Sequence, residues 1–85
     1  MHKKAIYNLA IGLVLKELHE ESRIDRSELA KALDTSDFDI SKIENGSLRM
    51  TAGELVLMME LFELDWAGFC ERVKKNLPRA EAAML

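Results

Sequence analysis

Helix-start signals recur at short intervals along this chain, and they restrict its fold more than any other feature of the sequence. Each begins with an Asp, Ser or Thr whose side chain can accept a hydrogen bond from a backbone N–H group shortly after it. Three are completed by an acidic residue at the third helical position. The signals are Asp25 with Glu28, Ser36 with Asp39, Thr51 with Glu54, and Asp65. Sustained alternation of apolar and polar residues, which marks strands, is missing. The sequence therefore predicts an all-α fold.

Apolar residues repeat at helical spacing between these signals and predict five helices. The first runs from about residue 4 to residue 22, the third from Asp37 to Asn45, and the fourth ends near Phe62. A positive φ is expected at Asp34 after the second helix, and Gly46 is expected to end the third. In chain order, the expected buried faces are Ile11, Leu15, Leu18, His19 and Ser22; Leu29, Ala30 and Leu33; Ile40 and Ile43; Leu55, Met58, Met59 and Phe62; and Trp66, Phe69, Cys70, Val73 and Leu77.

The length of 85 residues leaves room for one small domain. We expect a domain over residues 1–77 and a C-terminal tail over 78–85, in which residues 79–85 are either a helical extension that joins a dimer or a loose tail. The single cysteine, Cys70, excludes an internal disulfide and supplies no zinc ligand set, as expected in the reducing cytoplasm. The longest apolar run, residues 10–15, is far shorter than the roughly 18 residues of a membrane span. We therefore expect no membrane partner.

The sequence offers no arrangement typical of an active site. It contains neither a nucleophile with a base at usable spacing nor a glycine-rich loop that could hold a phosphate. Cys70 is most simply a small apolar residue of the fifth helix. We expect no enzyme activity, no catalytic or metal-binding residues and no cofactor.

Four short segments carry a resemblance to a known family. They are Ile11-Gly12, Leu15-Lys16, Glu28-Leu29-Ala30 and Ile40-Ser41-Lys42-Ile43-Glu44-Asn45-Gly46. Together with the helices expected around them, they resemble the five-helix, lambda-repressor-like DNA-binding domain of the Cro/cI-like (XRE-type) regulators over about residues 10–75. The resemblance implies a helix-turn-helix at about residues 26–45, with Ala30 where its two helices cross.

In that family the third helix lies in the major groove of DNA, and dimers bind half-sites one helical turn apart. The resemblance therefore implies roles for individual residues. Base contacts fall on Asp37, Phe38, Ser41 and Lys42, and phosphate contacts fall on Arg26, Asn45 and Arg49. Helical geometry agrees independently, because Phe38, Lys42 and Asn45 lie about 140 to 200° around the third helix from Ile40.

The charge of the chain departs from that of a usual DNA-binding domain. Its 12 Lys and Arg residues are outnumbered by 15 Asp and Glu, whereas phosphate contacts favour a basic surface. Asp37 and Asp39 either accept hydrogen bonds from cytosine amino groups or simply complement the N-terminus of the third helix. A local positive patch can still form from Arg26, Lys31, Lys42 and Arg49, with weak non-specific binding as the expected result.

Four further side chains have alternative roles. Phe38 contacts thymine methyl groups, marks a protein-binding surface, or folds over a neighbouring loop. His19 either packs at the core edge or bonds to Glu44, at a position where the family often has an arginine. Leu57 and Leu61 lie opposite the core stripe of the fourth helix, where they form a dimer interface or are covered by the fifth helix.

These features predict a cytoplasmic, sequence-specific regulator that binds double-stranded DNA as a homodimer at an inverted-repeat operator, as a repressor or autoregulator. The alternative is a helix-turn-helix module that binds a protein partner through Asp37, Phe38 and Asp39, with weak or no DNA binding. Under the first hypothesis Lys42→Ala relaxes base choice, whereas under the second it has no effect.

Overall fold

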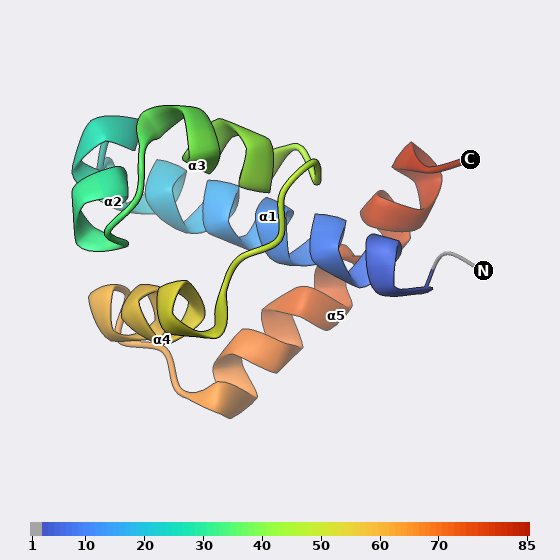
Figure 1. Cartoon of the computed structure of the whole chain (residues 1–85). Coiled ribbons are helices and arrows are strands. Elements are labelled where there is room, and N and C mark those ends of the chain that lie inside the picture. Colours follow the sequence, from blue (N-terminus) through green and yellow to red (C-terminus); the bar gives the residue numbers. More distant parts are fainter. Residues whose placement is uncertain (1–2) are drawn as a thin grey trace.

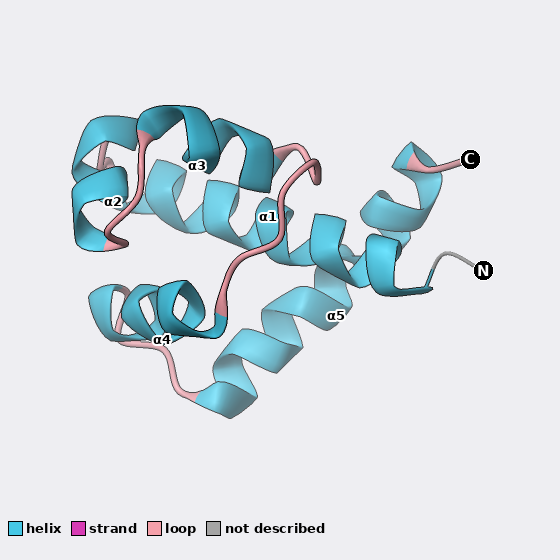
Figure 2. Cartoon of the chain, in the orientation of Figure 1, coloured by secondary structure: helices cyan, strands magenta, loops and turns pink. Residues whose placement is uncertain are grey.

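The computed structural model describes residues 3–85; Met1 and His2 of the expected domain lie outside the described residues. This part of the chain forms five helices: α1 (Lys3–Ser22), α2 (Arg26–Ala32), α3 (Asp37–Glu44), α4 (Ala52–Leu61) and α5 (Trp66–Ala83). Short loops join them, and residues 3–85 contain no strand (Figure 2). The predicted all-α class and the five helices are confirmed.

Side-chain caps fix where the last four helices begin. The accepting atoms are Oδ1 of Asp25, Oγ of Ser36, Oγ1 of Thr51 and Oδ1 of Asp65, each 2.7 to 3.1 Å from a backbone nitrogen three residues later. At α2 and α4 a glutamate also accepts a hydrogen bond from the N–H group of the capping residue, which completes a capping box. All four predicted helix starts are confirmed.

Residues in the left-handed backbone region follow the first four helices. Their φ angles are +57° at Arg23, +56° at Asp34, +84° at Gly46 and +54° at Glu63. After α3, the N–H group of Gly46 donates to the Ile43 carbonyl at 3.1 Å and that of Ser47 donates to the Lys42 carbonyl at 2.8 Å, which is the Schellman pattern. The expectations for Asp34 and Gly46 are confirmed, and the sequence reasoning missed Arg23 and Glu63.

Helix α1 is the central element of the molecule. Figure 1 shows α2 and α3 on one side of it and α4 and the first turns of α5 on the other. Helix α1 packs against α3 and α5, and α2 packs against α3 and α4. Gly12 allows the close approach of α1 to α3, because a Cβ atom there would clash with the carbonyl oxygen of Ile43 and lie 3.2 Å from the Cα atom of Glu44. This contact fixes the C-terminal turn of α3 against α1.

The buried core matches the predicted faces in most places. Its largest fully buried side chains are Val14, Leu15, Leu29, Leu33, Ile40, Ile43 and Met58. Two expectations are wrong, because Ser22 is exposed and Trp66 is 61% exposed. Helix α1 instead buries Ala10 and Val14, since α3 and α5 cover it from two directions. Trp66 is the first residue of α5 and borders an open hollow, with its ring centroid 5.7 Å from that of Phe69.

Helix α5 continues through Pro78 to Ala83. Proline donates no backbone hydrogen bond, so the carbonyl of exposed Lys74 loses its helical partner at this turn. Ala80, beyond the proline, is nevertheless fully buried in the core. Residues 79–83 therefore continue α5 and are not a loose tail, and Ala80 packs them against the core, while residues 84–85 follow the end of the helix.

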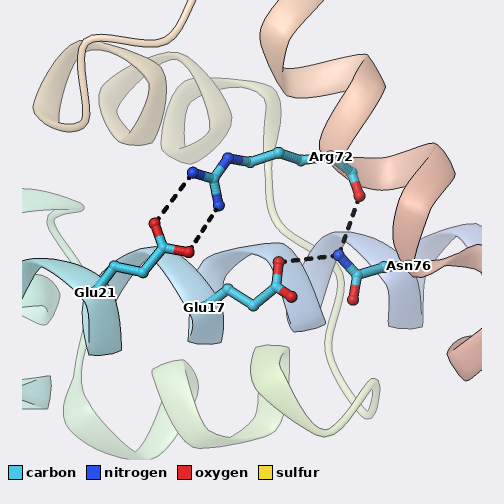
Figure 3. Close-up of polar contacts among 4 residues, drawn as sticks. All are labelled: Glu17, Glu21, Arg72 and Asn76. Carbon is cyan, nitrogen blue, oxygen red and sulfur yellow. Dashed lines mark hydrogen bonds and ion pairs between the residues drawn. The ribbon is translucent and has the colours of Figure 1, made fainter.

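A polar network joins α5 to α1 (Figure 3). Arg72 donates to both carboxylate oxygens of Glu21, at 3.0 and 3.2 Å. The buried Asn76 donates from Nδ2 to Glu17 Oε1 and to the Arg72 carbonyl oxygen, both at 3.0 Å. The hydrogen bonds from Arg72 hold the pKa of the Glu21 carboxyl below its usual value and raise the pKa of the Arg72 guanidinium.

Within residues 3–85, none of the helices has the length and apolar character that crossing a membrane requires.

Candidate nucleic-acid interface

Helix α3 turns one face to the core and the other to solvent. Ile40 and Ile43 are fully buried beneath it. On the opposite face Phe38 is 69% exposed, Lys42 is half-buried, and Asn45 is exposed at the end of the helix. The expected outward placement of these three residues is confirmed.

Phe38 and Lys42 lie together on this outer face. The Lys42 Nζ atom is 4.9 Å from the centroid of the Phe38 ring, within the range of a cation–π contact. The Phe38 ring therefore remains exposed to solvent, with the Lys42 ammonium group over one of its faces. The alternative in which Phe38 folds over a neighbouring loop is wrong, because that packing would bury the ring. The contact places one positive charge beside one apolar surface.

The two aspartates of the first turn have different environments. Asp39 is half-buried, and its Oδ2 accepts a hydrogen bond from Thr35 Oγ1 at 3.2 Å, while its N–H group donates to the Ser36 cap. It therefore helps to build the start of α3. Asp37 is exposed beside Phe38. Ser41, the remaining candidate for base contact, is half-buried on the same helix.

The three candidate phosphate-contacting residues lie on different segments around α3. Arg26 opens α2, and its side chain is 48% exposed with Nη2 3.4 Å from Glu44 Oε1. Asn45 follows the last turn of α3, and its Oδ1 accepts a hydrogen bond from the Ser47 N–H group at 3.0 Å. Arg49 is exposed in the loop that leads to α4. The sequence reasoning missed the contact between Arg26 and Glu44, although both residues were singled out.

Glu44 is a buried carboxylate between α1 and α2, with only 5% of its side chain exposed. His19 Nδ1 lies 2.6 Å from Glu44 Oε2, so these two side chains are in contact. Among residues 3–85, neither of these two atoms has a hydrogen-bond partner, so the predicted hydrogen bond between His19 and Glu44 is not formed. Charge attraction, which needs a protonated imidazole, is the interaction this contact supports.

The outer face of α4 is apolar. Leu57 and Leu61 each keep 37% of their surface exposed, and Val56 beside them is 55% exposed. More than a third of each leucine is therefore left exposed, so no other helix covers the two leucines completely. The face lies on a different helix from the base- and phosphate-contact candidates.

The sequence-predicted residues thus fall into two groups, one on and around α3 and one on the outer face of α4. The described part of the chain contains no group of three or more His, Cys, Asp or Glu side chains placed to hold a metal ion. A scan of protein-family models found no match to the chain, and searches of curated proteins and of solved structures found none either.

Proposed function

We propose that this chain is a sequence-specific DNA-binding transcriptional regulator, a repressor or autoregulator, that binds an inverted-repeat operator as a homodimer. In this proposal α2 and α3 act as a helix-turn-helix within a lambda-repressor-like fold. The observation that carries the proposal is the outer face of α3, where Lys42 and Phe38 project side by side. The buried Ile40 and Ile43 hold the helix in place behind them. A rigid helix with an outward cation suits entry into the major groove.

Each outward side chain has a matching partner on a base edge. The Lys42 ammonium donates to guanine O6 and N7, and the Phe38 ring contacts the methyl group of thymine. Asp37, which is exposed, accepts from the amino group of cytosine. Asp39 is already engaged by Thr35 and takes no part in base recognition in this proposal. Arg26, Asn45 and Arg49 contact phosphates on either side of the groove.

A salt series on a random-sequence duplex tests the phosphate contacts. Arg49→Ala should reduce the slope of log affinity against log salt by about 0.9, the value for one phosphate contact. Lys75→Ala is the matched control, because it also removes one exposed cation but lies on α5 in a solvent-exposed pair with Glu71. An equal effect of both substitutions, or of neither, would contradict the placement of Arg49 against DNA.

The homodimer is supported by the apolar face of α4. In the proposal Leu57 and Leu61 pack against their counterparts around a two-fold axis. Replacing both leucines by lysine should leave a folded monomer in sedimentation equilibrium, since the new charges would repel across the axis. Leu48→Lys is the control, because Leu48 has the same 37% exposure but lies in the loop after α3. A double variant that sediments like the unmodified chain would exclude this face as the interface.

A second candidate function is the capture of a protein partner by the same helix. The observation that favours it is the 69% exposure of Phe38 beside the exposed carboxylate of Asp37. Such a surface fits a partner with apolar and basic side chains. Under this function Phe38→Ala abolishes capture and Lys42→Ala leaves DNA affinity unchanged, whereas under the first function Lys42→Ala alters base choice.

A further inference from the structure

Glu44 connects three helices through one buried carboxylate. Its Oε2 lies 2.6 Å from His19 Nδ1 on α1, and its Oε1 lies 3.4 Å from Arg26 Nη2 on α2. Because only 5% of the Glu44 side chain is exposed, water compensates little of its charge. A buried carboxylate without a cation is strongly unfavourable, so Glu44 must attract whichever cations its two neighbours supply.

Histidine is the residue type whose unperturbed side chain changes charge between pH 5 and 8, and His19 is the histidine of this trio. Arginine stays protonated throughout this range. When His19 is protonated, two cations share the carboxylate. When His19 is neutral, Arg26 is its remaining cation. The Arg26 side chain is 48% exposed, so its guanidinium has room to turn either toward Glu44 or toward solvent.

Other charged groups near His19 are either in solvent or paired elsewhere. On α1, Lys16, Glu20 and Arg23 are exposed. The α5 cations Arg72 and Arg79 pair with Glu21 and Glu17, which lie about 200° around α1 from His19. On α3 the group that faces His19 is Glu44, and on α2 the group that faces Glu44 is Arg26. The charge on His19 therefore acts mainly on Glu44 and, through Glu44, on Arg26.

We propose that Glu44 is a positioning residue for Arg26, and that protonation of His19 releases the Arg26 guanidinium from Glu44 to a DNA phosphate. DNA binding by this chain is then stronger at acid pH than at alkaline pH. The inference rests on the proposed DNA-binding function, in which Arg26 contacts phosphate. It adds a pH-dependent control of that contact by a residue remote from DNA.

The two charge states of His19 determine in which direction the DNA affinity changes with pH. At acid pH protonated His19 balances Glu44, and Arg26 adds one phosphate contact, which makes the salt dependence of binding steeper by about 0.9. At alkaline pH Glu44 holds Arg26, and this contact is lost. The difference in affinity should be about two- to tenfold, the effect of one hydrogen bond in water.

The test measures the affinity of the full chain for a random-sequence duplex at about pH 5.5 and pH 8, the range in which histidine changes charge. His19→Gln, which cannot be protonated, should remove the two- to tenfold gain at acid pH and the steeper salt dependence. His2→Gln removes the other histidine of the sequence and should behave like the unmodified chain. Arg26→Ala should abolish the same gain, because the phosphate contact is then absent at both pH values.

Glu44→Gln provides a second route should His19→Gln fail to fold. It keeps the side-chain shape but removes the charge that holds Arg26, so affinity at pH 8 should rise to the value found at pH 5.5. Retention of the full pH effect in folded His19→Gln or Arg26→Ala, or in Glu44→Gln, would overturn this inference and leave the proposed function intact. Absence of DNA binding at both pH values would overturn the proposed function and the inference together.

Discussion

Gly12 is the position at which the packing of α1 against α3 tolerates least change. A methyl group there would clash with the Ile43 carbonyl oxygen and lie 3.1 Å from its carbon, and these backbone atoms cannot turn away. We expect Gly12→Ala to lower the free energy of unfolding by about 1 to 3 kcal/mol, the usual cost of overpacking. Urea denaturation followed by circular dichroism measures this change.

Gly53→Ala is the matched control for that substitution. Gly53 lies in α4, where the nearest atom to an added Cβ is 3.9 Å away. Alanine should therefore raise the free energy of unfolding by up to about 1 kcal/mol, because it is the better helix former. Equal effects of the two substitutions would show that Gly12 is not a close-packing position.

Glu63 occupies a backbone conformation that glycine adopts more easily. Its φ of +54° follows α4 in a Schellman motif, in which the Leu64 N–H group donates to the Met59 carbonyl at 2.9 Å. We expect Glu63→Gly to stabilise the chain by about 0.5 to 1 kcal/mol in thermal or urea unfolding, since relief of the left-handed strain outweighs the added freedom of the unfolded chain. Glu60→Gly, inside α4, should destabilise instead, and a loss of stability in both variants would refute this explanation.

The stability that the contact between α1 and α5 contributes depends on pH, because this contact includes the ion pair of Arg72 with Glu21. Because Arg72 lowers the pKa of Glu21, the pair stabilises the fold above the usual pKa range of a glutamate. This contribution disappears as the pH falls through the lowered pKa. In Arg72→Gln the pKa of Glu21 should rise toward its usual value in an NMR titration, and stability should fall at neutral pH but not at strongly acid pH.

Lys75→Gln is the control for the Arg72 substitution. It breaks the exposed pair of Lys75 with Glu71, in which both side chains are more than two-thirds exposed, so it should leave the acid limb of the stability curve unchanged. A pKa of Glu21 that is the same in Arg72→Gln as in the unmodified chain would show that the hydrogen bonds from Arg72 to Glu21 (Figure 3) do not lower this pKa.

At the scale of the whole molecule, the sequence predicts those features of the fold that depend on residues close together in the chain. Caps link residues three positions apart, and the faces of Ile40 and Ile43 follow from helical period, so both could be read without a structure. Contacts between distant segments could not. Arg72 and Glu21 are 51 positions apart, and no local pattern selects one arginine over another. The exposure of Trp66 likewise depends on how far α1 covers the start of α5.

The candidate site shows the same division. Periodicity placed Phe38, Lys42 and Asn45 on the outer face of α3, and the resemblance pointed to the contact of His19 with Glu44. The competition of Arg26 for the same carboxylate was missed, because the assignment of Arg26 to phosphate considered α2 alone. The positive φ angles of Arg23 and Glu63 were missed because neither residue type favours that conformation.

The central claim is that the outer face of α3 reads DNA sequence. Selection from a randomised duplex library at about 50 mM salt, where phosphate contacts are little screened, tests it most directly. The unmodified chain should enrich an inverted repeat with half-sites about one helical turn apart, and Lys42→Ala, run in parallel, should lose or change the preferred base at one position in each half-site. No enrichment by the folded chain, or the same enriched sequence from both proteins, would contradict the claim.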